Sequence, residues 1–194
     1  VTPYARLDLT LSPDDGTSGD EPLQDPHFWL DPTRLADVAV AVAERLSASR
    51  PDAAATFAAN LASLRADLDA LDASYHAGLR TCRSRDLVTS HTAFGYLADR
   101  YDLNQVGISG LNPEEEPTPA DLAAITEFVR ANNVLTIYSE SLVSPAIART
   151  IAAETGAATA VLDPLEGRSG PAGADFLAVM RINLATLRQG QVCT

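Results

Sequence analysis

Apolar side chains recur every three or four residues along two long stretches in the first half of the chain, and this spacing predicts amphipathic helices. The first helix is expected to begin at Asp31, which can cap it, with Pro32 in its first turn. The second is expected over residues 52–79. Its apolar positions are Phe57, Leu61, Leu64, Leu68, Leu71, Tyr75 and Leu79. An unbroken helix of this length would be roughly 40 Å long, so we expect it to act as a spine for the domain. A coiled-coil dimer is the alternative, with a seam of only about four heptads.

The pattern changes after Cys82, where short β-type runs alternate with amphipathic helical segments. Strands are expected over residues 86–90, 105–109, 134–140 and 158–163. Helices are expected over residues 93–101, 119–132, 145–155 and 174–189. Strands and helices in alternation indicate βαβ crossovers and a parallel sheet covered on both faces, so the fold class is α/β. Residues 8–24 combine Pro, Gly, Ser and acids without periodicity, which predicts a solvated loop.

The composition indicates a folded chain with a pronounced negative charge. Of 194 residues, 46% are hydrophobic and 21% are charged, which is enough apolar material for the core of one compact domain. All 14 basic residues are Arg and 26 residues are acidic, so the formal net charge is −12. Such a surface repels phosphate backbones and anionic lipid headgroups, which argues against nucleic acid or membrane-surface binding. Cations remain compatible partners.

Several kinds of segment and motif are missing from the sequence. No window approaches the roughly 20 apolar residues of a membrane span, and the first residues lack a signal-peptide pattern. The phosphate-binding loop, the dinucleotide fingerprint, the serine-hydrolase elbow and the H-E-x-x-H zinc motif are all absent. Nucleotide hydrolysis and serine hydrolysis are therefore disfavoured. The two cysteines, Cys82 and Cys193, are too far apart for a Cys-x-x-Cys pair, and from spacing alone they are equally compatible with one disulfide and with two free thiols.

Potential metal ligands stand at the ends of three predicted strands. His91, Glu140 and Asp163 each follow a buried run, and the carboxyl ends of parallel strands form the rim where ligands bind. Convergence of three such side chains indicates a metal site. The alternative is that the carboxylates only cap the following helices and that the histidine is structural.

The other two histidines lie in different settings. His27 belongs to the run DPHFWLDP, in which Pro26 and Pro32 restrict the backbone on both sides. A rigidly held His suits metal coordination, but the same run could be a lid anchored by Trp29 with His27 merely exposed. His76 follows an apolar position of the long helix and is expected to be solvated.

Six segments in order resemble the zinc-type metal-solute-binding proteins of bacterial ABC importers. They are DPHFWLDP, SHTAFGYLADRY, GLNPEEEPTPADL, IYSESLVSP, VLDPLEG and MRINLATLRQGQVC, between about Asp25 and Cys193. The resemblance implies two α/β lobes joined by a long helix, with the metal in the cleft between them. Residues 1–31 would then be the end of the N-terminal lobe and an acidic loop, residues 32–81 the linker helices, and residues 82–194 the C-terminal lobe. That lobe would be a four-stranded, mainly parallel sheet with helices on both faces.

The resemblance also assigns roles to single residues. His27, His91 and Asp163 would be metal ligands, and Glu140 would hold a ligand histidine by a hydrogen bond. Manganese-type relatives tend to carry a carboxylate at the position of His91, so an imidazole there favours Zn²⁺. The family's first histidine ligand lies in the N-terminal lobe and has no counterpart here, and the His-rich loop of many zinc-type members is replaced by acidic residues. An extracytoplasmic location, in the periplasm or at the cell surface by a lipid anchor, favours a disulfide between Cys82 and Cys193.

The function implied by the resemblance is capture of Zn²⁺ and its delivery to the membrane permease of an ABC importer. The full-length protein would be a monomer. It would not be an enzyme, because a site saturated by His and carboxylate ligands leaves no position for a reacting water. One alternative is a zinc-dependent hydrolase, with His27, His91 and Asp163 as ligands and Glu140 or Glu166 as the base. The other is a metal-independent, adhesin-like lobe.

Overall fold

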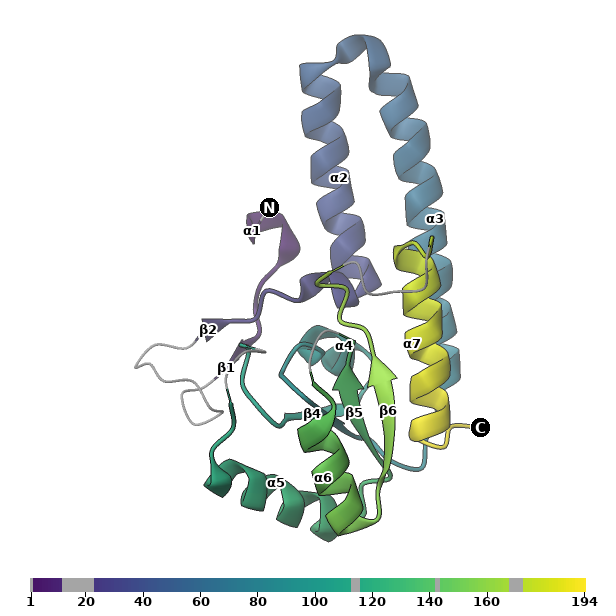
Figure 1. The fold of residues 1–194 in the computed structure, drawn as a ribbon. Coiled ribbons are helices and arrows are strands. Elements are labelled where there is room, and N and C mark those ends of the chain that lie inside the picture. Colours follow the sequence, from purple (N-terminus) through teal and green to yellow (C-terminus); the bar gives the residue numbers. More distant parts are fainter. Residues whose placement is uncertain (1, 12–22, 113–115, 142–143, 168–172) are drawn as a thin grey trace.

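The protein consists of an α/β lobe from which a helical hairpin projects (Figure 1). The computed structural model describes residues 2–112, 116–141, 144–167 and 173–194, except for residues 12–22. The N-terminal helix and the short strands that follow it lie beside the base of the hairpin, and the C-terminus lies at the end of the last helix (Figure 1).

A four-stranded sheet forms the centre of the lobe. Its strands are β3 (Asp86–Thr89), β4 (Asn104–Gly107), β5 (Thr136–Glu140) and β6 (Ala158–Leu162). They lie in the order β4-β3-β5-β6 and all three pairings are parallel. The predicted α/β class and parallel sheet are therefore confirmed. Because the chain leaves β3 toward β4 on one side and returns to β5 on the other, the carboxyl ends of β3 and β5 flank the crevice where ligands bind in such sheets.

Both faces of the sheet are covered, as the sequence predicts. Neighbouring residues of a strand point to opposite faces, so Leu87 and Tyr138 belong to one buried cluster while Val88 and Ile137 belong to the other. Helices α4 (Gly95–Arg100) and α7 (Phe176–Gly190) contribute to the first cluster. Helices α5 (Pro119–Ala131) and α6 (Ala146–Thr155) contribute to the second.

The projecting hairpin consists of α2 (Pro32–Ser49) and α3 (Ala54–Leu79), joined by the short 3₁₀ helix η3 (Pro51–Ala53). Asp31 caps α2 as predicted, because its side chain accepts a hydrogen bond from the backbone N–H of Thr33. Only the second half of the predicted apolar seam on α3 is core: Tyr75 and Leu79 are buried, whereas Leu64 is 37% exposed.

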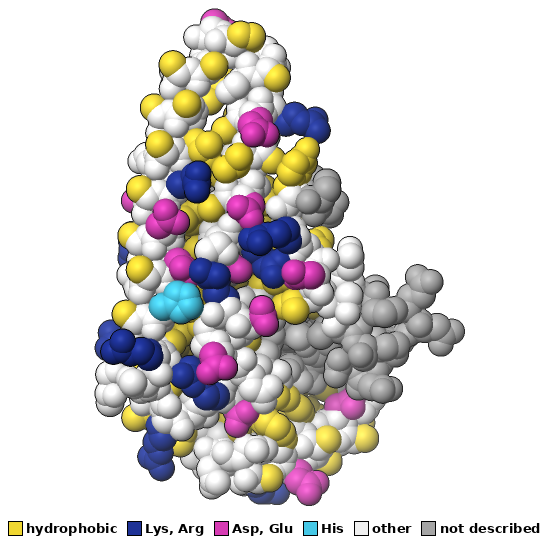
Figure 2. Space-filling model, turned by 180° about the vertical axis from the view of Figure 1, so that it is seen from behind, with side chains coloured by type: hydrophobic (Ala, Val, Ile, Leu, Met, Phe, Trp, Pro, Cys, Tyr) yellow, Lys and Arg dark blue, Asp and Glu magenta, His cyan; other side chains and the backbone are white. Residues whose placement is uncertain are grey.

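The two halves of α3 have different neighbours. The buried half packs against α7, where the hydroxyl of Tyr75 donates to the carbonyl of Met180 over 2.7 Å. The other half packs against α2, beyond the sheet. Figure 2 shows hydrophobic side chains along the hairpin and, lower down, Arg interspersed with acidic side chains.

The segment before the first long helix is more ordered than the sequence predicts. After α1 (Thr2–Ala5), strands β1 (Thr10–Leu11) and β2 (Leu23–Gln24) pair antiparallel within the expected loop. The prediction of a loop without strands was therefore wrong at both ends, because strands of two residues are too short to show a periodic pattern. The acidic residues Asp14, Asp15, Asp20 and Glu21 lie outside the described residues.

Cys82 and Cys193 form a disulfide with an S–S distance of 2.05 Å, as the resemblance predicts. The bond joins the segment after α3 to the segment after α7, at the amino-terminal end of the sheet. Within the described part of the chain, no helix is both long and apolar enough to span a membrane.

Candidate metal centre

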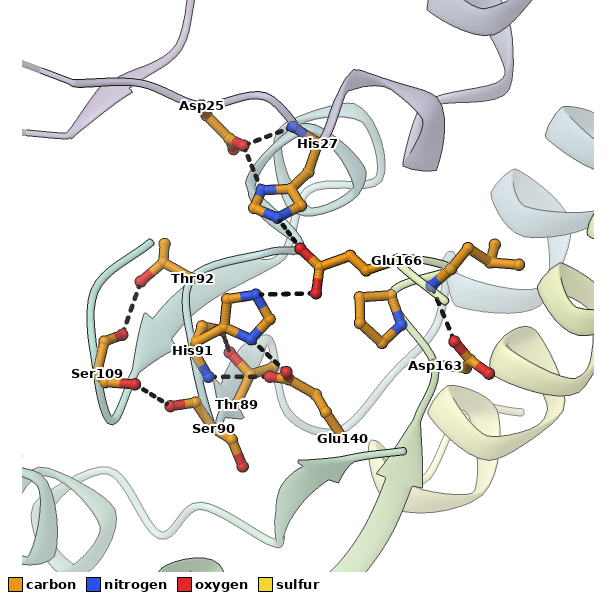
Figure 3. Close-up of polar contacts among 12 residues, drawn as sticks. Asp25, His27, Thr89, Ser90, His91, Thr92, Ser109, Glu140, Asp163 and Glu166 are labelled. Atoms are coloured by element: carbon orange, nitrogen blue, oxygen red, sulfur yellow. Dashed lines mark hydrogen bonds and ion pairs between the residues drawn. The ribbon is translucent and has the colours of Figure 1, made fainter. Parts of the chain in front are cut away.

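His91 follows β3 and is completely buried at the carboxyl end of the sheet. Its carbonyl accepts a hydrogen bond of 2.7 Å from the Thr89 hydroxyl, and its backbone N–H donates to Oε1 of Glu140 over 2.9 Å. The other oxygen of Glu140 contacts Nδ1 of the imidazole (Figure 3). Glu140 is the last residue of the neighbouring strand β5, so the sheet itself brings the two side chains together. Nε2 of His91 is buried and has no hydrogen-bond partner among the residues that the structure describes.

His27 has the same arrangement on the opposite side of the site. It precedes the 3₁₀ helix η2 (Phe28–Leu30) and is buried. Oδ1 of Asp25 accepts the backbone N–H of His27 over 2.8 Å and lies 2.6 Å from its Nδ1. Each imidazole therefore has Nδ1 held by a carboxylate, and this fixes the ring orientation while Nε2 faces the site.

Glu166 places its carboxylate between the two rings (Figure 3). Its Oε1 lies 2.8 Å from Nε2 of His27, and its Oε2 lies 3.6 Å from Nε2 of His91. One ligand atom from each of the three residues lies within 4.8 Å of the other two. The histidine side chains are almost fully buried, whereas that of Glu166 is 27% exposed. Glu166 is therefore the member of the group nearest to solvent.

The acidic neighbours change the pKa of His27. Burial by itself would lower this pKa, but the hydrogen bonds and negative charges of Asp25 and Glu166 outweigh burial and raise it above its ordinary value of 6.5. The same carboxylates of Asp25 and Glu166 that stabilise the imidazolium would also attract a metal cation bound beside His27. Two imidazole nitrogens and a carboxylate oxygen also form a ligand set that suits Zn²⁺.

Asp163, the predicted third ligand, lies apart from this group. Its Oδ1 accepts the backbone N–H of Leu165 over 2.8 Å, and in Figure 3 its carboxylate lies away from the imidazoles. Among the described residues, the group that can hold a metal contains Glu166 instead. The role of Asp163 as a ligand therefore stays a prediction, and the geometry does not support it.

The sequence pattern gives two residues of this group no ligand or orienting role. Glu166 enters only as the possible base of a hydrolase, although it follows Asp163 by three residues in the same motif. Asp25 precedes His27 by two residues, a spacing that allows a carboxylate to reach both the backbone and the ring.

His76, expected to be solvated, has a side chain that is 54% exposed, and its Nε2 lies 3.7 Å from Oδ1 of Asp72 on the same helix.

Comparison with known proteins adds the family. The profile described as "ZnuA: Zinc-uptake complex component A periplasmic" matches residues 4–190. The zinc-binding lipoprotein AdcA of Streptococcus pneumoniae serotype 4 is 42% identical over 179 residues, which cover 91% of this chain and 36% of AdcA. The high-affinity zinc uptake system protein ZnuA of Bacillus subtilis is 36% identical over 167 residues, which cover 84% of this chain and 52% of that protein.

Solved structures agree with the observed fold. The laminin-binding protein Lbp of Streptococcus pyogenes matches with a TM-score of 0.81 and 40% identity, covering 87% of this chain and 66% of that one. A Zn(II)-bound variant of AdcAII from Streptococcus pneumoniae matches with a TM-score of 0.78 and 34% identity, covering 87% and 61%. The chain thus spans only part of the relatives that it matches. The profile match over almost the whole chain shows that this protein belongs to the ZnuA family of zinc-uptake components.

Proposed function

We propose that the chain is the C-terminal part of an extracytoplasmic protein that captures Zn²⁺ and delivers it to the membrane permease of an ABC importer. The observation that carries this proposal is the pair of buried imidazoles, each held at Nδ1 by a carboxylate and each facing Glu166 with Nε2. The ligands would be Nε2 of His27, Nε2 of His91 and a carboxylate oxygen of Glu166.

The chemistry of these groups favours zinc over harder divalent ions. Mg²⁺ and Ca²⁺ prefer all-oxygen sites, whereas borderline-soft Zn²⁺ accepts imidazole nitrogen together with carboxylate oxygen. Both rings are oriented before the metal arrives, so little side-chain entropy is lost on binding. Names of relatives agree with this choice, since AdcA is called a zinc-binding lipoprotein and ZnuA of Bacillus subtilis a high-affinity zinc uptake protein.

Tetrahedral zinc needs a fourth ligand beyond the three that this chain supplies. The resemblance implies that a histidine of an N-terminal lobe provides it. Under that arrangement, residues 1–31 would be the end of that lobe with the acidic loop, residues 32–81 the linker helices and residues 82–194 the C-terminal lobe. The buried side chains at the end of α3 pack into the same core as the sheet. A movement of the linker helix would therefore shift side chains in the core of the lobe.

Membership of the ZnuA family supports the proposed location and partner. The family is named for a periplasmic zinc-uptake component, and the relative AdcA is called a zinc-binding lipoprotein. The disulfide between Cys82 and Cys193 suits an oxidising compartment. The permease partner and a monomeric state of the full-length protein are part of the same proposal.

The roles of the two glutamates argue against a zinc hydrolase. Glu140 is committed to the backbone and ring of His91, and Glu166 contacts both imidazoles, so neither is available as a general base beside a bound water. Zinc-loaded protein is therefore expected to cleave ester and phosphate-ester substrates no faster than free zinc does. Substantial, chelator-sensitive turnover would favour the hydrolase instead.

A competition titration tests the proposal, with zinc and a chromophoric chelator as the competing partners. His27→Ala and His91→Ala should each weaken zinc binding by an order of magnitude or more, because each removes a nitrogen ligand. His76→Ala is the matched control, since this histidine lies outside the site, and it should bind zinc like wild type. Equal affinities for all four proteins would overturn the proposed site.

A further inference from the structure

The turn that carries Glu166 is held by α7 at its start. Beyond the end of β6, the backbone N–H of Asp163 donates to Oδ1 of Asn183 over 3.0 Å, and Nδ2 of Asn183 donates back to the carbonyl of Asp163 over 2.8 Å. Asn183 is 1% exposed. This reciprocal pair of hydrogen bonds satisfies both backbone groups of Asp163 and ties them to α7.

The middle of the turn has an unusual backbone conformation. Leu165 has φ of 60°, in the left-handed region that branched apolar residues rarely adopt. Its N–H is the donor to the side chain of Asp163, a bond of 2.8 Å that closes a local Asx-type turn. The side chain of Leu165 packs against the buried cluster of the lobe. Glu166, the next residue, then reaches the two imidazoles, while Asp163 lies away from them (Figure 3).

A third contact joins this turn to the segment of His27. Nε1 of Trp29 donates to the carbonyl of Pro164 over 2.8 Å, and the rings of Trp29 and His27 lie edge to face with centroids 5.4 Å apart. The turn is therefore tied to α7 on one side and to the His27 segment on the other.

We propose that Asp163 is a positioning residue for Glu166: its side chain holds Leu165 in the left-handed conformation that directs Glu166 toward His27 and His91. This inference rests on the proposed zinc site and deepens it. It differs from the assignment of Asp163 as a metal ligand, since a positioning residue acts only through Glu166. Left-handed strain at a functional position persists where surrounding contacts enforce it, and here those contacts come from Asp163, Asn183 and Trp29.

Two substitutions at one position separate positioning from ligation. Asp163→Asn keeps an oxygen that accepts the Leu165 N–H but loses the carboxylate charge needed by a ligand, whereas Asp163→Ala loses both. We expect Asp163→Asn to bind zinc within about threefold of wild type, because the bond to the Leu165 N–H is kept. Asp163→Ala should bind about tenfold to 100-fold more weakly, as residues that orient metal ligands do. Should Asp163→Ala fold poorly, Trp29→Phe removes the hydrogen bond to Pro164 but keeps an aromatic ring, with an expected loss of zinc affinity of about threefold to tenfold.

The dependence on Glu166 is tested by combining substitutions. In a Glu166→Ala background, Asp163→Ala should cause no further loss of zinc affinity, because there is no longer a ligand to position. Equal losses for Asp163→Asn and Asp163→Ala would overturn the inference and make Asp163 a ligand. A full further loss in the Glu166→Ala background would overturn it as well. A wild-type chain that binds no zinc would instead overturn the proposed function itself.

Discussion

Oδ1 of Asp25 lies 2.6 Å from Nδ1 of His27, and the other oxygen of the same carboxylate lies against Gly95 at the start of α4. A Cβ atom at position 95 would come within 2.7 Å of Oδ2 of Asp25. The close approach of this buried carboxylate to the helix therefore requires a glycine. The orientation of His27 thus depends on a residue that is distant in sequence and touches no ligand atom.

Removal of the Asp25 carboxylate should weaken zinc binding without removing a ligand. We expect Asp25→Ala to lower affinity about tenfold to 100-fold, because Nδ1 of His27 loses the partner that fixes its ring. Gly95→Ala should lower affinity in the same direction, since the new methyl group displaces Asp25. Calorimetric titration with zinc measures both effects. Affinities equal to wild type in both variants would show that Asp25 does not orient His27.

Zinc binding and metal-free stability should depend on pH in opposite directions. The raised pKa of His27 means that the protonated ring stabilises the metal-free fold below the ordinary value of 6.5, and this contribution is lost as pH rises through the raised value. Zinc binds only the neutral ring, so protons and metal compete for it. The zinc-induced increase in melting temperature should therefore grow as pH rises from about 5 to about 8.

Melting curves with chelator and with zinc test both trends on the same protein. His76→Ala should follow the wild-type curves, because it leaves the site intact. In His27→Ala the stabilisation of the metal-free fold at acid pH should disappear. A zinc-induced shift in melting temperature that is the same at every pH would contradict the proposed role of His27.

The disulfide should support the lobe without taking part in metal binding. Cys82 and Cys193 are 111 residues apart in sequence, and closing a loop of this length stabilises a fold by about 4 to 5 kcal/mol in the chain-entropy model. A Cys82→Ala and Cys193→Ala double variant should lose stability on that scale in urea. Its zinc affinity below the unfolding transition should match wild type, because the bond lies at the opposite end of the sheet from the histidines. Two free thiols in denatured, unreduced wild type would exclude the bond.

The long elements of the fold were predictable and the shortest ones were not. Helix α2 was expected from Asp31 and Pro32, and it begins there because the cap and the apolar spacing agree. The four strands of the main sheet lie within two residues of their predicted positions, since each is a buried run between polar segments. Strands β1 and β2 were missed because pairs of two residues depend on contacts between distant segments.

The geometry of the candidate metal centre brings together the two histidines that the sequence indicates, but it places Glu166 beside them in place of Asp163. His91 follows a strand directly, so the strand-end rule places it at the rim of the sheet. The same rule selects Asp163 after β6, yet the structure presents Glu166 to the histidines. The difference arises at Leu165, whose left-handed backbone redirects the chain. Because leucine rarely adopts that conformation, its sequence carries no sign of the turn.

The position of zinc in a crystal of this protein grown with zinc, located by anomalous scattering at the zinc absorption edge, tests the proposed site most directly. We predict an ion about 2.0 to 2.2 Å from Nε2 of His27, Nε2 of His91 and a carboxylate oxygen of Glu166. Asp163 should remain bonded to the Leu165 N–H and outside the coordination sphere. An ion bound elsewhere, or one ligated by Asp163 in place of Glu166, would contradict the proposed zinc site.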